Sequence, residues 1–489
     1  MQNQSEHTLD PDNWDDMRAQ GHRMLDDIFD HMQRLNDGPV WQPAPAEVRQ
    51  VFKEALPKTQ TGLDQVHRSF LRNILPYAIG NAHPGFMGWV QGGGTPVGML
   101  AEMLAAGINA NVGGRDQIPV EVERQVVRWV RELFSFPDTA SGIFVTGTSL
   151  ANLIGVLVAR TSALGTDARK TGLRVNGTRL VAYASKAAHG CVTQAMDLSG
   201  LGIDALRSIP FTRHGEIDLD ILQSTIEHDR ENGYTPFLIV GNAGTVDTGA
   251  VDNLSALADV AQREKLWFHV DGAYGALGML APDVAPRLSG IERADSIAFD
   301  FHKWAQIQYD AGFILVRDGS MHYDTFASPA AYLQRETRGM AANSPWPCDF
   351  GPDLSRGFRA LKTWFAIKTY GAERLGKVIS GTCALARYLG NRIQDDTRLE
   401  LLAPVSLSIV CFRYRGQDGS AITDPARLDR INNDIVIALQ ESGIAAPSTT
   451  IIDGRLAIRV ALFNHRTNAT HIDAMLNAVL ELGAEAARS

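Results

Sequence analysis

The segment from Ser296 to Trp304, SIAFDFHKW, places a lysine directly after a short apolar run. A run of this kind predicts a buried strand, so Lys303 is expected at the carboxyl end of that strand, beside aromatic neighbours. Desolvation there lowers the pKa of a lysine ammonium group, which is what a Schiff base with a carbonyl compound requires. Taken alone, the segment also fits a surface lysine. The pattern makes Lys303 a candidate Schiff-base lysine.

A second apolar run ends in an aspartate, in the sequence LWFHVDGAYG from Leu266 to Gly275. A carboxylate at Asp271 can pair with a protonated pyridine nitrogen and keep such a ring an electron sink. The small Ala273 would let a flat ring lie close to the backbone. The spacing from Asp271 to Lys303 is 303 − 271 = 32 residues, about one strand–helix–strand step. Alone, Asp271 fits a helix N-cap equally well.

Three other polar segments each follow an apolar run. In VTGTSLAN, the hydroxyls of Thr148 and Ser149 and the backbone N–H groups can meet a phosphate at a helix N-terminus. The turn lacks the lysine of a nucleotide-binding P-loop. In ASKAAH, the His189 imidazole can stack on a flat heteroaromatic ring. The glycine-rich loop GNAGTVDTGAVD can bring Thr245 near the substituents of such a ring.

Short apolar runs that alternate with helical stretches must position these side chains. Each run is bounded by Gly, Pro, Asn or Asp, as in the buried strands of a mostly parallel sheet. Such sheets bind ligands at the carboxyl ends of their strands, where all five polar segments fall. The predicted strands are 142–146, 179–184, 208–210, 236–241, 266–270, 296–299 and 312–316, with helices at 96–107 and 118–134 among those between them.

The two ends of the chain have other patterns. Residues 13–36 and 63–75 have helical periodicity and flank a proline-rich stretch, 37–60, that is expected to be extended. We expect residues 1–92 to form a helical arm that packs on another subunit. A large domain is expected at 93–375, and a small α+β domain at 376–489 follows a long helical stretch, 359–388. Its predicted strands are 399–402, 406–414 and 456–460, and its helices 425–441 and 470–482.

The composition excludes several protein classes. The chain has 489 residues and a formal net charge of −9, which argues against a nucleic-acid-binding surface. Its four cysteines lack the spacing of a zinc site, so we expect reduced thiols and no metal. The N-terminus has no signal-peptide pattern and no apolar stretch is long enough to cross a bilayer. A cytoplasmic enzyme is the expectation.

The order of these motifs resembles the group II pyridoxal-5′-phosphate (PLP)-dependent amino-acid decarboxylases. The motifs are GTSxAN, AH, AGTxxxGAxD, HVDxAYG and HKW, and the similarity runs from His83 to Arg459. The resemblance implies the aspartate-aminotransferase-like fold type I of PLP-dependent transferases, with a mostly parallel central sheet. It also implies a homodimer with active sites near the subunit interface, and an enzyme of amino-acid metabolism that acts on a small-molecule amino acid.

The resemblance assigns a role to each matching position. It makes Lys303 the Schiff-base lysine, Asp271 the partner of the pyridine nitrogen, and His189 the ring-stacking residue implicated in protonation. Cofactor contacts are further implied for Thr148, Ser149, Thr245, Ala273 and His302. Substrate contacts are implied for His83, Phe86, Trp89 and Arg459, the last with the substrate carboxylate. Phe86 and Trp89 favour an aromatic or apolar substrate, although they fit simple packing equally well.

Two positions depart from the family pattern. The family commonly has an asparagine three residues before the lysine, where this chain has Asp300, and a carboxylate there would repel a phosphate. The family's mobile loop carries a catalytic tyrosine, but the corresponding residues, Ala341 to Asp349, contain none. The nearest tyrosine is Tyr332.

The expected reaction is decarboxylation of an L-amino acid, with an aromatic substrate favoured, to the amine and CO₂ through a Lys303 Schiff base. Without the loop tyrosine, the donor of the final proton is open between His189, Lys303 and a residue of the partner subunit. Two other reactions stay open: decarboxylation with oxidative deamination by O₂ to an aldehyde, and C–C bond cleavage by a lyase or aldolase. A protein of this fold that acts only by interaction is a further alternative.

Overall fold

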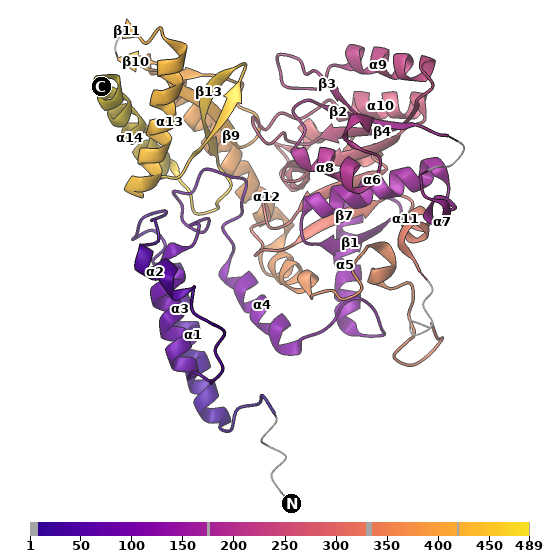
Figure 1. The fold of residues 1–489 in the computed structure, drawn as a ribbon, viewed down its shortest axis with the longest axis horizontal. Coiled ribbons are helices and arrows are strands. Elements are labelled where there is room, and N and C mark those ends of the chain that lie inside the picture. Colours follow the sequence, from indigo (N-terminus) through magenta and orange to yellow (C-terminus); the bar gives the residue numbers. More distant parts are fainter. Residues whose placement is uncertain (1–7, 174–176, 329–334, 418–419, 489) are drawn as a thin grey trace, which may run out of the picture.

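The computed structural model describes residues 8–173, 177–328, 335–417 and 420–488. The chain begins with α1 (Trp14–Gln33), α2 (Ala46–Val51) and α3 (Leu63–Asn73). Asn13 starts α1, because its side-chain oxygen accepts a hydrogen bond from the Asp15 N–H at 2.9 Å. In Figure 1, α1 and α3 lie side by side and project away from the body of the molecule. The expectation of an extended stretch over residues 37–60 was wrong at α2, a helix of six residues.

A seven-stranded sheet occupies the middle of the chain, with the strand order β1-β7-β6-β5-β4-β2-β3. The strands from β6 to β3 in that order run parallel, and β7 is antiparallel to both of its neighbours. The mostly parallel sheet predicted from the sequence is therefore confirmed. The strands are β1 (Ser141–Val145), β2 (Leu180–Ser185), β3 (Leu206–Ile209), β4 (Thr235–Asn242), β5 (Trp267–Asp271), β6 (Ser296–Asp300) and β7 (Gly312–Val316).

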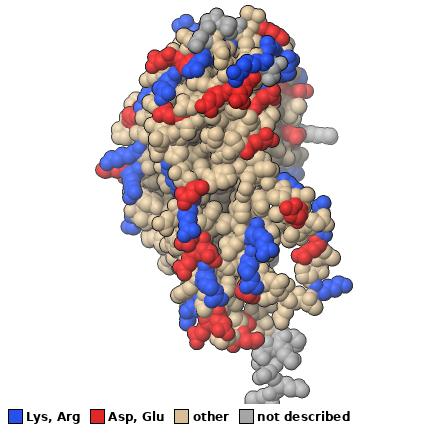
Figure 2. Space-filling view, turned by 90° about the vertical axis from the view of Figure 1, so that its left-hand side faces the viewer, with Lys and Arg blue, Asp and Glu red and all other residues tan. Residues whose placement is uncertain are grey.

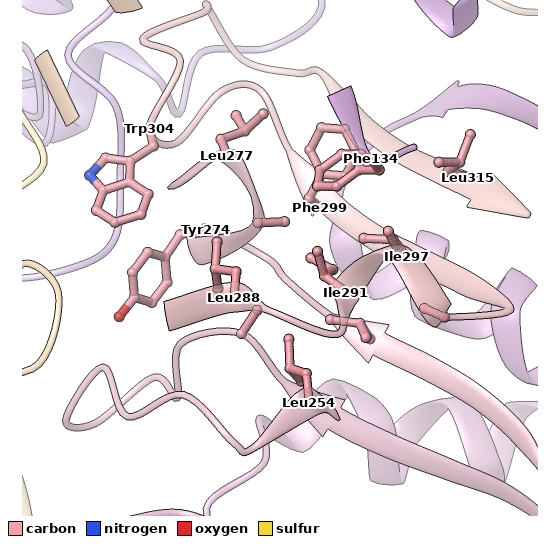
Figure 3. Close-up of a cluster of buried hydrophobic side chains, with 14 of the residues drawn as sticks. Phe134, Leu254, Tyr274, Leu277, Leu288, Ile291, Ile297, Phe299, Trp304 and Leu315 are labelled. Atoms are coloured by element: carbon pink, nitrogen blue, oxygen red, sulfur yellow. The ribbon is translucent and has the colours of Figure 1, made fainter. Parts of the chain in front are cut away.

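Helices cover both faces of this sheet. One face packs on α6 (Thr148–Leu164) and α8 (Gly190–Leu198), through residues such as Ile154 and Val192. The opposite face forms the larger core with α5 (Ile118–Leu133), α9 (Leu219–Glu231), α10 (Leu254–Glu264) and part of α12 (Arg359–Gln394). Figure 3 shows Ile297 and Phe299 of β6 in this core with Phe134, Leu254 and Ile291. The remaining helices here are α4 (Pro96–Ile108), α7 (Ala168–Thr171) and α11 (Gly319–Phe326).

A second, antiparallel sheet has the order β12-β13-β9-β8. It comprises β8 (Leu399–Leu401), β9 (Ile409–Tyr414), β12 (Ser448–Ile452) and β13 (Arg455–Ala461). A buried cluster joins this sheet to α13 (Pro425–Ser442), α14 (Ala469–Arg488) and the end of α12. A two-stranded ribbon of β10 (Gly416–Gln417) and β11 (Ser420–Ala421) completes the fold.

The long helix α12 connects the two sheets and changes direction at Gly371, where φ is 73° and ψ is 156°. This conformation suits glycine, which has no Cβ to clash at positive φ. The predicted domain boundary at residue 375 falls inside α12 and stays a prediction.

Two surface properties bear on the classes excluded above. Among the described residues, no helix combines the length and apolarity needed to cross a membrane. On the face shown in Figure 2, basic and acidic side chains are interspersed over the body and the arm. That face therefore presents no continuous basic field of the kind that binds nucleic acid.

Candidate active site

Alternation along two neighbouring strands places the polar residues on one face of the large sheet. Trp267, His269 and Asp271 are two residues apart in β5, so their side chains share a face, and Ser296 and Asp300 do so in β6. Because His269 pairs with Ser296 in the parallel register, the two sets lie side by side. The intervening apolar residues point into the core on the opposite side. The polar face meets the first two turns of α6.

A cavity of about 410 Å³ opens at the carboxyl ends of these strands. It brings together nine residues that the sequence singled out: Trp89, Thr148, Ser149, His189, Thr245, Asp271, Ala273, His302 and Lys303. They come from six segments of the chain that are far apart in sequence. The sheet topology thus assembles the predicted constellation at one place.

Lys303 lies at the centre of this cavity, in the turn after β6. Its Nζ is 2.8 Å from a carboxylate oxygen of Asp300, and its side chain is 20% exposed. Gly92 crosses this turn, and its N–H donates to the His302 carbonyl at 3.1 Å. A Cβ at residue 92 would lie 2.6 Å from the carbonyl oxygens of His302 and Lys303, so only glycine lets the segment pass. The amine therefore sits in a narrow, partly covered place with solvent access.

Asp271 forms the floor of the cavity and is 4% exposed. Burial raises the pKa of its carboxyl group. A hydrogen bond from Asn152 Nδ2 at 2.9 Å opposes that shift most strongly, followed by the positive charge of Lys303 and the Ala273 N–H at 3.1 Å. The carboxylate is thus desolvated but fixed by donors, as a partner for a protonated ring nitrogen must be.

The N-terminus of α6 lies at the other end of the cavity. Gly147 is the N-cap and contributes no side-chain cap, and the Thr148 N–H donates to Asp300 at 2.8 Å. The Thr148 hydroxyl is buried and, among the described residues, has no hydrogen-bond partner. Ser149, which follows, is exposed to the cavity. The unused Thr148 hydroxyl at a helix N-terminus suits a phosphate, and Asp271 suits the ring nitrogen, so the residues present fit PLP at both of its ends, with Asp300 the one unfavourable charge beside the phosphate.

The other lining residues are held by their own loops. His189 is the N-cap of α8, and its Nδ1 accepts from the Cys191 N–H at 3.1 Å. Thr245 accepts at its hydroxyl from the Ala250 N–H at 3.1 Å. His302 accepts at Nδ1 from the Ala311 N–H at 3.0 Å, and burial lowers its pKa. These bonds fix the directions from which the side chains face the cavity.

Three predicted substrate residues do not line this cavity. His83 is buried, with its Nε2 3.2 Å from the Gly38 carbonyl, and Phe86 packs in a small cluster with Val40. Arg459 is 4% exposed, and its guanidinium donates to the carbonyls of Val246 and Gly88, both at 2.5 Å. A substrate carboxylate would have to compete with these carbonyls for Arg459. In this structure, the hydrogen bonds of Arg459 connect β13 to the loop that carries Thr245.

Sequence reasoning missed three residues at the site. Asn152 and Cys191 contact the Asp271 carboxylate, the latter through Sγ at 3.9 Å. Burial raises the pKa of the Cys191 thiol to about 12, so it stays protonated. Tyr309 lines the cavity with its ring 4.3 Å from that of His302. The spacing of four residues from Thr148 to Asn152, one helical turn, was the available signal for Asn152.

The segment from Ala341 to Asp349, which contains no tyrosine, packs beside β1 at the edge of the large sheet. Trp346 is buried, and its ring N–H donates to the Ala342 carbonyl at 2.9 Å. Asp349 accepts from the Trp346 N–H at 2.7 Å and contacts Arg335. Tyr332 lies outside the described residues.

Comparisons with known proteins extend these observations. Residues 45–415 match the model of the pyridoxal-dependent decarboxylase conserved domain. The aromatic-L-amino-acid decarboxylase of Bacillus atrophaeus is 31% identical, covering 96% of this chain and 95% of that protein. A phenylacetaldehyde synthase of Petunia hybrida is 28% identical, covering 96% and 94%. A crystal structure of Oryza sativa TDC with PLP and tryptamine superposes with a TM-score of 0.88 at 25% identity, covering 98% and 99%.

The match to the domain model spans well over half of the chain, and the fold and the cavity agree with it. The chain is a PLP-dependent carboxy-lyase with the fold type I architecture, and it belongs to the pyridoxal-dependent decarboxylase family.

Proposed function

We propose that this enzyme decarboxylates an aromatic L-amino acid to the corresponding amine, with Lys303 as the cofactor-binding lysine. The observation that carries the proposal is the placement of Lys303 and Asp271 on one cavity, with Trp89 at its edge. Trp89 is 48% exposed, although its neighbour Phe86 is buried. An exposed indole at a cavity mouth offers a surface on which an aromatic substrate can stack. The names of the relatives point the same way.

Each of these cavity residues is expected to have its own role in the reaction. When bound, PLP supplies an electron sink that stabilises the negative charge left by CO₂. Asp271 holds a proton at the ring nitrogen, because a buried carboxylate strongly favours a paired cation. Thr148 and Ser149 would hold the phosphate, and His189, at the N-terminus of α8, would contact the ring. Lys303 would hold the cofactor through its amine, and in its protonated form that amine would be a proton donor within the cavity.

Tyr309 extends the apolar side of the same cavity. Its ring packs on His302 and is 49% exposed, and burial of its hydroxyl raises its pKa. A protonated phenol there can donate a hydrogen bond to a polar substituent on a substrate ring. We propose that Trp89 and Tyr309 together favour aromatic over short aliphatic side chains.

The test is a substrate panel on the PLP-loaded enzyme. Aromatic L-amino acids are expected to release CO₂ and the amine in equal amounts, faster than glutamate or alanine. Trp89→Ala should raise KM for aromatic substrates by about tenfold, the loss of one stacked ring contact with its buried area. The absence of CO₂ release from every amino acid tested would refute the proposal.

Oxidative decarboxylation is the second candidate, favoured by two observations. The sequence from Ala341 to Asp349 contains no tyrosine, and a phenylacetaldehyde synthase is among the similar proteins. In that reaction O₂ is consumed, and aldehyde, ammonia and peroxide form in place of the amine. Measuring O₂ uptake and peroxide beside CO₂ separates the two outcomes. Retention of the carboxylate in the product would instead indicate C–C bond cleavage.

We also propose that the working enzyme is a homodimer, in which the second copy covers exposed apolar side chains of α1 and α4. Exposed apolar side chains lie along α1 and α4, among them Trp14 at 62%, Met17 at 40%, Met103 at 51% and Ile108 at 60%. These side chains of α1 and α4 are exposed in a single chain, and α1 projects from the body together with α3 (Figure 1). A second copy would remove that area from water. Light scattering should give twice the 53.3 kDa mass of one chain, and Ile108→Glu should lower it.

A further inference from the structure

A continuous line of buried hydrogen bonds leads away from the cavity floor. Asn152 Nδ2 donates to Asp271 at 2.9 Å, and Asn152 Oδ1 lies 2.8 Å from His269 Nε2. On the far side of the imidazole, His269 Nδ1 is 2.7 Å from Ser296 Oγ. Trp267 Nε1 donates to the same Ser296 oxygen at 2.8 Å. Of these residues only Asp271 lines the cavity.

The chemistry of the partners fixes where each proton lies. The amide oxygen of Asn152 can only accept, so His269 must carry its proton on Nε2. The ring is completely buried, which lowers its pKa to about 3 and keeps it neutral. Its Nδ1 is therefore an acceptor, and the Ser296 hydroxyl must donate to it. Because the Trp267 N–H can only donate, it donates its hydrogen bond to the Ser296 oxygen. All the bonds run in one direction, toward Asp271.

The packing around His269 leaves the ring one place to lie. A Cβ on Gly155, one turn after Asn152 in α6, would lie 2.7 Å from His269 Cε1 and 2.8 Å from its Nδ1. The helix thus comes close enough to the sheet for Asn152 to span the space between His269 and Asp271. His269 and Ser296 are 1% and 0% exposed. If the Asn152 amide were reversed, its NH₂ group would face the His269 N–H, which is also a donor. Its oxygen would face the Asp271 carboxylate, which is also an acceptor.

We infer that His269 and Ser296 are positioning residues that hold Asn152 in the one orientation that donates to Asp271. By doing so they favour the ionised form of the carboxylate, whose pKa the Asn152 hydrogen bond lowers against the effect of burial, and they fix its direction, although neither lines the cavity. The inference rests on the proposed role of Asp271 and adds the residues through which the fold controls it. Trp267 completes the line by orienting the Ser296 hydroxyl.

The test compares the affinity of the cofactor-free enzyme for two ligands. One is PLP, and the other is the analogue in which CH replaces the ring nitrogen. The ratio of the two dissociation constants isolates the contact between Asp271 and that nitrogen, since all other contacts are shared. In the unsubstituted enzyme PLP should bind at least about tenfold more tightly, the value of one hydrogen bond to a charged group. If both ligands bind equally, the role of Asp271 fails, and the inference fails with it.

Substitutions then separate the positioning role from simple damage. Asn152→Leu should reduce the preference for PLP about tenfold, and His269→Phe about threefold, since it removes a neutral hydrogen bond. His269→Gln should restore most of the preference, because its amide can donate to Asn152. The control is Thr161→Val in the same helix, which loses a buried hydroxyl bond to the Leu157 carbonyl at 2.9 Å, outside the line.

The outcomes decide the inference in either direction. A preference that falls in Asn152→Leu and His269→Phe, returns in His269→Gln and is unchanged in Thr161→Val supports it. If His269→Phe weakens both ligands by the same factor and leaves their ratio unchanged, His269 has a merely structural role, and the inference is refuted. The visible absorption band of the loaded variants should shift only where the ratio falls.

Discussion

A carboxylate oxygen of Asp300, the last residue of β6, lies 2.8 Å from Nζ of Lys303, which lies in the turn that follows this strand. The other oxygen of the same carboxylate accepts from the Thr148 N–H at the start of α6. Asp300 is 2% exposed, and His302 Nε2 is 3.5 Å from it. This one carboxylate therefore contacts both the lysine and the helix N-terminus at which a phosphate is expected.

Asp300→Asn should tighten PLP binding by about tenfold. The amide keeps an oxygen that accepts from the Thr148 N–H, but it removes a negative charge that would repel the phosphate. We expect the loss of this repulsion to contribute ~1.4 kcal/mol to the binding free energy, which is a tenfold change in the dissociation constant. Titration of the cofactor-free enzyme, followed by protein fluorescence, measures the change. Pyridoxal without its phosphate is the control ligand and should gain little. Equal gains for both ligands would contradict the argument from phosphate repulsion.

Acid should destabilise the protein through two buried histidines. Burial lowers the pKa of His269 and of His322 from 6.5 to about 3. Between pH 6.5 and 3 the unfolded chain binds protons that the folded chain refuses, so the free energy of unfolding falls as pH falls. Each histidine contributes at most about 1.4 kcal/mol per pH unit. Urea unfolding at several pH values should show this slope, and His322→Phe should reduce it by one histidine's share. An unchanged slope in that variant would refute the assignment.

Gly155→Ala should destabilise the fold by about 1–3 kcal/mol, because the added methyl group overlaps the His269 ring. Gly381 in α12 is the matched control, since its Cβ would meet nothing within 4 Å. Gly381→Ala should stabilise the protein by about 0.5–1 kcal/mol through the helix preference for alanine. Chemical denaturation of both variants tests the pair. Effects of opposite sign are expected, and a stabilising Gly155→Ala would show that the ring has room to move.

Arg356→Met should cost about 3–5 kcal/mol of unfolding free energy. Arg356 and Glu123 are both buried, with Nη2 2.6 Å from Oε1, and Arg356 also donates to the Phe144 carbonyl at 2.7 Å. Removing one charge leaves the other buried without its partner. The double variant Glu123→Met with Arg356→Met should recover part of the loss. A single variant as stable as the unsubstituted chain would mean that Glu123 has another cation or accepts a proton at little cost.

Much of the large sheet was predictable because its strands are short apolar runs that end at polar residues. The seven predicted runs overlap β1 to β7, with ends that differ by a few residues at most. Two of the elements that the sequence did not predict show the physical reasons. The strand β12 (Ser448–Ile452) has the sequence STTII, with neither a long apolar run nor apolar/polar alternation, and the six-residue α2 is too short to show helical periodicity.

The residues of the candidate site were predictable where they lie at or just after the end of a strand. They were not predictable where they lie within a strand and contact the cavity residues only through other side chains. Lys303, Asp271 and His189 were found by that rule, and the cavity contains all three. His269 and Ser296 were not, because each lies inside an apolar run and reads as core packing in the sequence. Arg459 was matched by motif, but its hydrogen bonds to the carbonyls of Val246 and Gly88 depend on tertiary contacts that spacing alone does not reveal.

The central claim is that Lys303 carries the cofactor. The most direct test is to reduce the PLP-loaded enzyme with borohydride, digest it, and locate the modified peptide by mass spectrometry. The mass of the reduced cofactor should appear on the peptide that contains Lys303, and Lys303→Arg should carry none. A cofactor mass on any other lysine, or its absence from an enzyme that releases CO₂, would contradict the account.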